Sequence, residues 1–231
     1  MIIEAIDVTK VYETRGVETR ALDDVSLALG KGEFTALAGP SGSGKTTLLN
    51  LLGALDTPTS GKIQLDGVEL SDLSASALSA LRLRKLGFVF QAYNLIPVLS
   101  ARENVEFVME LQGISLKERR KRADEVLERV ELGGLGDKRP LEMSGGQQQR
   151  VAVARAIASR PSIVLADEPT ANLDSGTAQR LLDLMLQLNR EDGVTFLFST
   201  HDPLVMDSAR RLVRLRDGKI IGDETKAPSS T

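Results

Sequence analysis

The 231-residue sequence has no cysteine, no tryptophan and one histidine, and aromatic residues make up only 3% of it. The lack of cysteine excludes disulfides and thiolate metal sites and fits a reducing compartment. The scarcity of aromatic side chains does not favour a surface that stacks single-stranded nucleic acid. A net charge of −3 provides no general attraction for nucleic acid either. We therefore expect no nucleic-acid partner.

Long apolar runs are also missing. No run approaches the roughly 20 residues that a membrane helix requires, and the N-terminal residues MIIEAIDVTK lack the basic and apolar regions of a signal peptide. We expect a chain that does not insert into a bilayer itself, although it can dock on proteins that do. A basic run, KERRKR at residues 117–122, is typical of the solvated face of a helix.

The apolar residues follow two patterns along the chain. Alternation or short apolar runs predict strands at residues 2–8, 21–29, 34–38, 62–70, 163–166, 194–199, 211–216 and 219–221. Helical spacing predicts helices at residues 46–55, 101–111, 116–131 and 176–189. Glycine-containing turns of the hairpin kind occur at residues 30–32, 66–67 and 217–218.

Residues 39–46, GPSGSGKT, match the pattern G-x-x-x-x-G-K-[ST] between a predicted strand and a predicted helix. Glycines allow successive backbone N–H groups to turn toward phosphate oxygens, and the helix start adds its dipole. Lys45 would place its charge on the β- and γ-phosphates, and Thr46 would bind Mg²⁺ through its hydroxyl. A plain glycine-rich turn is the alternative. The predicted nucleotide contacts are Gly39, Pro40, Ser41, Gly42, Ser43, Gly44, Lys45, Thr46 and Thr47.

Two adjacent acids, Asp167 and Glu168, follow an apolar strand at the edge where ligands of α/β proteins gather. We expect Asp167 to hold Mg²⁺ and Glu168 to polarise the attacking water; a charged turn before Pro169 is the alternative. His201 follows another core strand and could bond a γ-phosphate, or it could be structural. Gln91 follows an apolar stretch in the same way, or is an exposed loop glutamine.

The stretch MSGGQQQR, residues 143–150, precedes an apolar helical run. Two glycines are a poor start to a helix, since each costs about 1 kcal/mol relative to alanine at an interior position. Ser144 and Gln147 fit a capping box, but a capping box does not require Gly145 and Gly146, whereas close approach to a phosphate does. We therefore predict a second anion site, in which capping and ligand roles coexist.

In this order the motifs resemble those of the nucleotide-binding subunits of ABC transporters. The resemblance covers about residues 2–221, and its Ser-Gly-Gly-Gln signature is highly specific, whereas the P-loop alone is not. The wording FVFQAYNLIPVLSARENV and ADEPTANLD is most similar to the ATPases of lipoprotein-release and macrolide-efflux systems (LolD/MacB-like). The motifs that carry the resemblance are residues 39–46, Gln91, residues 144–147, Asp167, Glu168, residues 172–174 and His201.

The resemblance implies where the two anion sites meet. In such ATPases two subunits associate head to tail, and each ATP lies between the P-loop of one subunit and the signature of the other. The residues Ser144, Gly145, Gly146 and Gln147 would thus bind the partner's nucleotide, and Asp174 would lie across the dimer interface. Tyr12 would stack on adenine, although an aromatic residue in a short strand can also be core. Gln91 would sense Mg²⁺ and the attacking water.

The predicted fold class is α/β: a P-loop NTPase core with a mixed, mostly parallel sheet, an antiparallel β subdomain and an inserted α-helical subdomain. A single ABC ATPase domain would span residues 1–221, with the helical subdomain at about 92–160, and we expect a disordered tail at 222–231. Met143 and Ala171 depart from the commoner leucine and glycine of the family, and neither change affects the predicted activity.

The implied function is an ATP-hydrolysing subunit that powers an ABC transporter, an exporter or a lipoprotein, peptide or macrolide extrusion system. ATP and Mg²⁺ would be bound, Glu168 would act as general base, and Lys45, Gln91 and His201 would assist. Permease subunits on separate chains would hold the protein at the cytoplasmic face of the inner or plasma membrane. A soluble ABC-type ATPase of DNA repair or translation is the alternative, and a P-loop small-molecule kinase leaves residues 144–147 unexplained.

The segment AYNLIPVL at residues 92–99 is unusually apolar for a connector. It could pack in the core. Alternatively, some of Tyr93, Leu95, Ile96 and Val98 line a groove for a short helix of the membrane subunit, which Gln91 would link to the γ-phosphate.

Overall fold

The structure, a computed structural model, describes residues 1–14 and 16–226. The chain divides into two compact units. The first unit contains Met1–Ala80 and Thr195–Thr231, and the second contains Leu81–Val194. The predicted α/β class with an antiparallel sheet, parallel strand pairs and a helical subdomain is confirmed.

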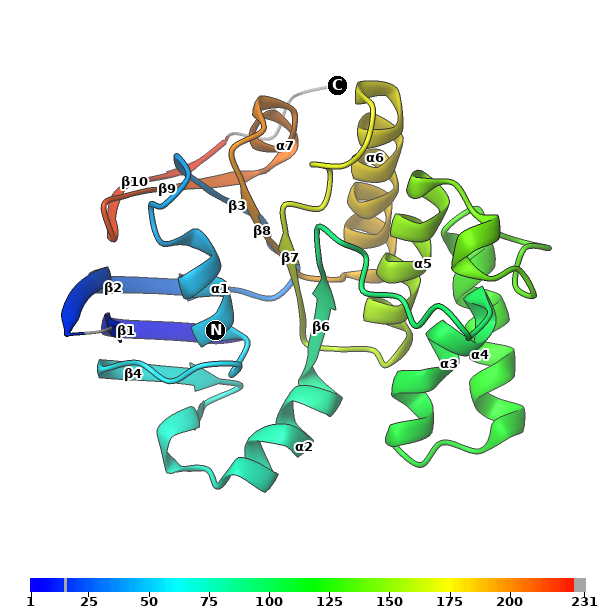
Figure 1. Cartoon of the computed structure of the whole chain (residues 1–231), viewed down its shortest axis with the longest axis horizontal. Coiled ribbons are helices and arrows are strands. Elements are labelled where there is room, and N and C mark those ends of the chain that lie inside the picture. Colours follow the sequence, from blue (N-terminus) through cyan, green and yellow to red (C-terminus); the bar gives the residue numbers. More distant parts are fainter. Residues whose placement is uncertain (15, 227–231) are drawn as a thin grey trace. The chain divides into compact units, whose positions relative to one another are not determined.

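The first unit contains an antiparallel sheet with the strand order β2-β1-β4-β5 (Figure 1). Its strands are β1 (Ile3–Thr14), β2 (Val17–Leu29), β4 (Ser60–Leu65) and β5 (Val68–Glu69). The turn between β4 and β5 has φ of 50° at Asp66 and 76° at Gly67, which are the values of a hairpin of type I′. The hairpin predicted at residues 66–67 is therefore confirmed.

The hairpin predicted at residues 30–32 is wrong, because this turn leads from β2 to a strand of a different sheet. Two side chains bind the amides of the turn: Gly30 N–H donates to Glu33 at 2.7 Å, and Gly32 N–H donates to the Thr195 hydroxyl at 2.9 Å. These bonds direct the chain away from β2 and into β3.

The second group of strands in the first unit has the order β10-β9-β3-β8. Its members are β3 (Phe34–Ala38), β8 (Phe196–Thr200), β9 (Arg211–Arg216) and β10 (Lys219–Thr225). Strand β3 runs parallel to both β8 and β9, and every residue of β3 and β8 is buried. This burial explains why their sequences are almost wholly apolar. Helix α1 (Lys45–Leu52) follows β3, and the short helix α7 (Pro203–Ser208) follows β8.

The chain stays ordered beyond the predicted domain end at residue 221, because β10 continues to Thr225. Lys226 N–H then donates to the carbonyl of Arg210 at 2.7 Å. The start of the predicted disordered tail is therefore wrong by at least four residues of strand. An ion pair between Arg211 of β9 and Asp223 of β10 stabilises this end of the strand, and the polar composition of the segment does not reveal it. The rest of the predicted tail, residues 227–231, lies outside the described part of the chain.

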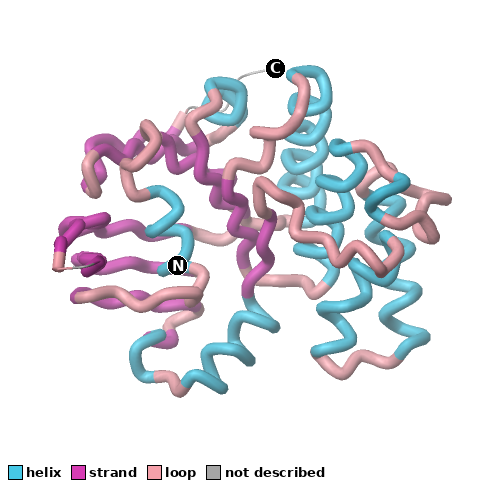
Figure 2. The backbone as a smooth tube through the Cα atoms, viewed as in Figure 1, coloured by secondary structure: helices cyan, strands magenta, loops and turns pink. Residues whose placement is uncertain are grey.

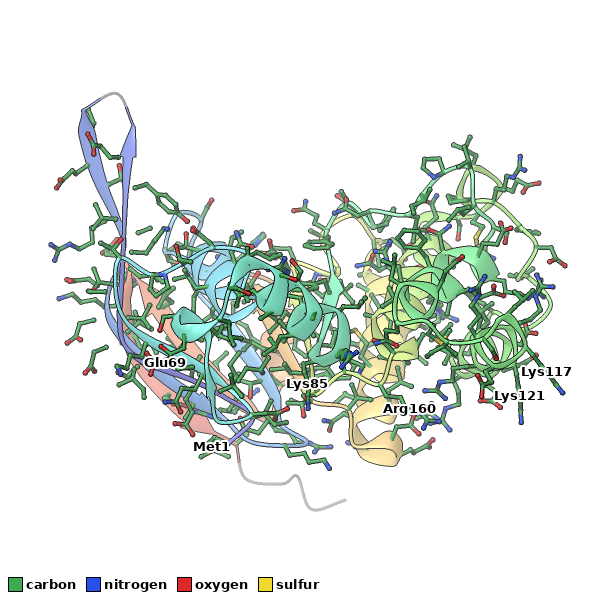
Figure 3. All side chains as sticks on the ribbon, turned by 90° about the horizontal axis from the view of Figure 1, so that it is seen from below. Met1, Glu69, Lys85, Lys117, Lys121 and Arg160 are labelled. Carbon is green, nitrogen blue, oxygen red and sulfur yellow. The ribbon has the colours of Figure 1, made fainter. Side chains whose placement is uncertain are left out.

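The second unit combines a parallel pair of strands with helices. Strands β6 (Leu86–Val89) and β7 (Ile163–Asp167) are accompanied by α3 (Ala101–Leu111), α4 (Leu116–Arg129), α5 (Gly145–Ala158) and α6 (Ser175–Asp192). Helices α3, α4 and α5 pack side by side (Figure 1). Lys117 and Lys121 of the basic run point outward from α4 (Figure 3), as the predicted solvated face requires. Arg119 departs from that prediction, because its side chain is only 18% exposed and pairs with Glu106 of α3.

Helix α2 (Ala75–Lys85) is not predicted by the sequence, and it spans the boundary between the two units. None of its residues is buried, so its apolar side chains follow no helical period that could reveal it. Over the residues that the structure describes, every helix is too short or too polar to cross a bilayer.

Arg211 joins three segments of the first unit. Its guanidinium donates to both carboxylate oxygens of Asp223 at 2.8 and 2.7 Å, to Glu33 at 2.9 Å and to the Ala28 carbonyl at 2.7 Å. The hydrogen bonds from Arg211 hold the pKa of Asp223 below its usual range, although burial opposes this. The stability that this pair contributes is complete above the usual aspartate pKa, and it is lost as the pH falls through the lowered value.

We predict that Arg211→Met lowers the free energy of unfolding by about 1 kcal/mol, because it removes the hydrogen bonds that the partly exposed carboxylates of Asp223 and Glu33 and the Ala28 carbonyl accept from the guanidinium. Urea denaturation at neutral pH measures this loss. The matched control is Arg214→Met. The Arg214 side chain is 48% exposed and makes a long ion pair with Glu224, at 3.8 Å, so its loss should lower the free energy of unfolding by less than about 0.5 kcal/mol. Equal losses in the two variants would contradict the prediction.

Candidate functional site

The glycine-rich loop between β3 and α1 is enclosed from behind by backbone. A Cβ atom on Gly39 would lie 2.1 Å from the carbonyl oxygen of Leu215, and one on Gly44 would lie 2.5 Å from that of Ala21. Gly44 also has a φ of 103°, which disfavours other residues. Only glycine fits at either position, so the loop keeps its backbone bare on the side where a ligand would approach.

The polar groups of this loop are poorly satisfied by the protein itself. Lys45 is buried, and among the residues that the structure describes its ammonium group donates only to the carbonyls of Gly39 and Pro40, at 2.8 and 3.1 Å. The Ser43 hydroxyl is buried and has no hydrogen-bond partner among the described residues. A buried cation without a carboxylate and a buried hydroxyl without a partner are both costly. A polyphosphate would satisfy both.

His201 and Tyr12 belong to the same unit as this loop. In the parallel pair of β3 and β8, Ala38 lies opposite Thr200, so Gly39 and His201 leave their strands at the same edge. Tyr12 lies on β1, and its hydroxyl interacts with the side chain of Thr47. The residue as a whole is 37% exposed, so the core interpretation of Tyr12 is wrong.

The second unit brings Gln91 and Asp167 to one edge of its strand pair, because Val89 of β6 lies opposite Ala166 of β7. The Asn172 amide donates to the Gln91 carbonyl at 2.9 Å. Glu168 has a φ of 46°, a left-handed conformation that is uncommon outside glycine and that often marks a functional position.

Gln149 is a residue of this region that sequence reasoning missed. Its side chain is fully buried, and its amide donates to the Pro169 carbonyl at 2.7 Å and, more weakly, to the Phe90 carbonyl at 3.5 Å. It thus joins α5 to the chain after β6 and to the chain after β7. Its neighbours in the sequence are polar, so the signal that could have revealed it is its spacing of three, four and seven residues from the apolar Ala152, Val153 and Ala156.

The signature motif begins α5 with a complete capping box. The Ser144 hydroxyl accepts from Gln147 N–H at 3.3 Å, and the Gln147 side chain accepts from Ser144 N–H at 3.0 Å. The predicted capping role is therefore confirmed, whereas contact with a nucleotide stays a prediction.

The two glycines of the signature have a packing reason that the sequence argument overlooked. A Cβ atom on Gly145 would lie 2.8 Å from the Tyr93 hydroxyl, and one on Gly146 would lie 2.4 Å from a methyl carbon of Thr177. Packing is therefore a second reason for these glycines, and their close approach to a phosphate stays a prediction.

Asp174 caps the neighbouring helix α6, where its carboxylate accepts from Thr177 N–H at 3.0 Å. Hydrogen bonds from the side chain and backbone of Thr177 hold the pKa of Asp174 below its usual range. Because Thr177 also contacts Gly146, the signature and Asp174 lie at adjoining helix starts.

The connector at residues 92–99 is an open loop between β6 and α3 (Figure 2), and none of its residues is buried. The core interpretation is therefore wrong. Its backbone is nevertheless fixed at both ends: Arg155 donates to the carbonyls of Tyr93 and Asn94, and the buried Asn104 amide donates to the Leu99 carbonyl at 3.1 Å. The connector thus combines a held backbone with accessible side chains.

Thr46, in the first unit, supplies a hydroxyl, and Asp167, in the second unit, supplies a carboxylate; both are oxygen ligands of the kind that Mg²⁺ prefers. In the part of the chain that the structure describes, no three histidine, aspartate or glutamate side chains gather around one point. That the two residues bind one Mg²⁺ stays a prediction.

A bare glycine loop between a parallel strand and a helix that begins with Lys-Thr defines a P-loop nucleotide-binding protein. The chain belongs to the ABC transporter family, whose model matches residues 22–171. It is an ATP-binding cassette and an ABC ATPase.

Three relatives show the range of this similarity. An uncharacterized ABC transporter ATP-binding protein of Thermotoga maritima is 48% identical over 225 residues, which cover 97% of this chain and 96% of the relative. The lipoprotein-releasing system ATP-binding protein LolD of Anaeromyxobacter dehalogenans is 46% identical and covered to 93%. The macrolide export ATP-binding/permease protein MacB of Syntrophobacter fumaroxidans is 49% identical, but this chain spans only 31% of its length.

Among solved structures, the chain is similar to the cassette MJ0796 of Methanocaldococcus jannaschii. That structure is a dimer in a post-hydrolysis state bound to ADP and Pi. The TM-score is 0.89 at 44% identity, with 97% of this chain and 99% of the other covered.

Proposed function

We propose that this cassette hydrolyses ATP as a head-to-tail homodimer and thereby powers a transporter whose permease subunits are separate chains. The phosphate loop carries this proposal, because its buried Lys45 and its unpartnered Ser43 hydroxyl are groups that a polyphosphate would satisfy. The dimer that MJ0796 forms at 44% identity supports the mode of assembly.

In the proposed reaction, a water attacks the γ-phosphorus in line while the bond to the leaving ADP oxygen breaks. Glu168 takes the proton of this water, and Lys45 stabilises the charge on the phosphates. His201 orients the γ-phosphate, and Gln91 positions the water. Mg²⁺, which Thr46 and Asp167 would hold, neutralises phosphate charge when bound.

The signature would act in trans. The N-terminus of α5 presents backbone N–H groups and a positive dipole end, which favour an anion. Ser144, Gly145 and Gly146 would contact the γ-phosphate bound by the P-loop of the partner subunit. Asp174, at the adjoining start of α6, would lie in the same interface.

Ser144→Arg tests the dimer. We expect it to abolish ATP-dependent dimerisation, since the long cationic side chain blocks close approach of the partner's nucleotide, while the monomer still binds ATP. Size-exclusion chromatography with light scattering measures dimerisation, and calorimetry measures binding. Ser144→Thr is the control, because it retains a capping hydroxyl. Loss of ATP binding by the monomer would mean that the signature acts in cis and that this assembly is wrong.

Glu168→Gln tests the base. The amide cannot accept the water's proton, so we expect turnover to fall by about 100-fold or more. MgATP binding should persist, and an ATP-bound dimer should accumulate. Phosphate release and dimer content are the measurements. Near-normal turnover would show that Glu168 is not the base.

The similarity to LolD and MacB-type proteins supports an export or extrusion system as the setting. The cassette would then be held at the cytoplasmic face of the membrane by its permease subunits. We propose that the connector at residues 92–99 receives them, because its backbone is fixed while its apolar side chains stay accessible.

Ile96→Asp tests this contact. We expect it to abolish co-purification with the permease subunits in detergent and to uncouple transport, because a carboxylate opposes burial in an apolar groove. The fold and the basal ATPase rate of the isolated subunit should not change. Val17→Asp is the control, since Val17 is an apolar residue of the first unit that is 65% exposed. An Ile96→Asp variant that assembles and transports normally would contradict the proposal.

A further inference from the structure

Two charged side chains, Lys10 and Asp56, contact the side chain of Tyr12. Lys10, two residues earlier on β1, places its ammonium nitrogen 4.8 Å from the centre of the Tyr12 ring. The same nitrogen donates to Asp56 at 2.7 Å and to the Thr57 carbonyl at 2.7 Å. The Tyr12 hydroxyl donates to the second carboxylate oxygen of Asp56 at 2.9 Å. All of these residues lie in the first unit.

The charge of Lys10 is held in an unusual place. Its side chain is only 11% exposed, although lysine is seldom buried unless it is paired. Its contacts here are a carboxylate, a carbonyl and the face of an aromatic ring, and each of them attracts a cation. The ammonium group therefore needs the Tyr12 ring in this position as one of its few partners.

Asp56 fixes the far end of the ring. Burial opposes ionisation of Asp56, but hydrogen bonds from Lys10, Tyr12 and the Thr57 backbone outweigh it and hold its pKa below the usual range. The pKa of Tyr12 is raised by burial and by its bond to Asp56. At neutral pH the carboxylate is thus charged and the phenol keeps its proton, so the bond between them persists.

This arrangement leaves the ring with one occupied face and a fixed hydroxyl, while the residue as a whole remains 37% exposed. A ring held at its hydroxyl and covered on one face can accept a second planar group only on the opposite face. It also loses little freedom when that group binds, which favours binding.

We propose that Lys10 and Asp56 are positioning residues for the nucleotide base: they hold the Tyr12 ring so that a planar base stacks on the face opposite Lys10. This inference rests on the proposed function, in which Tyr12 stacks on the base of ATP. It adds two residues that neither contact the phosphates nor belong to the motifs named above.

The cluster of Lys10 and Asp56 also fixes the Tyr12 ring, the stacking platform, relative to the phosphate loop. Asp56 follows α1, the helix that begins at Lys45. The chain after Asp56 is bound to β1 by two further bonds: Thr59 N–H donates to the Thr9 carbonyl at 2.8 Å, and Val11 N–H donates to the Thr59 hydroxyl at 3.0 Å. The position of the ring is thus tied to the end of the helix that the phosphate loop begins.

Stacking recognises the flat face of a base and not the groups at its edge. The platform should therefore serve ATP and GTP alike and contribute nothing to inorganic tripolyphosphate, which has no base. Tripolyphosphate binding reports on the phosphate loop alone, so it separates a loss of the platform from a general loss of folding.

The experiment measures the dissociation constants of the full chain for MgATP, MgGTP and magnesium tripolyphosphate by calorimetry, at concentrations where the chain is monomeric. Lys10→Met keeps the volume of the side chain but removes its charge, and we expect it to weaken MgATP and MgGTP binding by about tenfold. Tyr12→Phe keeps the ring but loses the bond to Asp56, and should weaken both by about threefold. Tripolyphosphate affinity should not change in either variant.

Lys62→Met is the matched control, because Lys62 lies in the same sheet with a side chain that is 60% exposed and pairs with Glu69 instead of an aromatic ring. It should bind all three compounds as the unchanged chain does. Unchanged MgATP affinity in Lys10→Met, or an equal loss of MgATP and tripolyphosphate affinity, would overturn the inference. Tyr12→Ala separates the two levels: if it binds MgATP normally, the stacking role of Tyr12 itself is wrong.

Discussion

The phosphate loop depends on how closely two other segments of backbone pass behind it. The carbonyls of Leu215 on β9 and Ala21 on β2 occupy the space that side chains at residues 39 and 44 would need. The turn at Gly218 adds a bond from its N–H to the Ser43 carbonyl at 3.1 Å. These contacts exist only because β3 is paired in parallel with β9 and because β2 crosses beside the loop. The cradle is thus a product of the whole first unit and not of its own eight residues.

The second unit is organised around α5. Ser144 caps the helix, Gln149 binds the chain after β7, and Arg155 binds the connector after β6. One helix therefore holds the signature, the chain after Glu168 and the connector. In the proposed function, these three places would face a nucleotide, a water and a partner. A displacement of the helix would reach all of them, which is a physical route for coupling between sites.

Elements could be predicted from the sequence wherever function or burial restricts the residue types of a short segment. The apolar strands at residues 34–38 and 163–166, the phosphate loop and the capping box of the signature could all be predicted, because each depends on neighbours within a few residues. Helix α2 could not, since it buries none of its residues and leaves no apolar period. The turn at residues 30–32 failed because its amides bind Glu33 and the distant Thr195. The pairing of Lys10 with Asp56 joins residues 46 positions apart, beyond the reach of any local pattern.

The glycines of the two anion sites differ in what excludes a side chain from them. Behind Gly39 and Gly44 stands main chain, which no substitution elsewhere can remove, whereas Gly145 and Gly146 are confined by the Tyr93 hydroxyl and a Thr177 methyl. No substitution at another position can therefore make room for a side chain at Gly39 or Gly44. In the signature, by contrast, smaller residues at positions 93 and 177 would make room for an alanine at Gly145 or Gly146. If relatives with smaller residues at these two positions still kept glycine at 145 and 146, packing would not explain the glycines. Under the proposed function, the phosphate bound by the partner subunit would then be the reason for them.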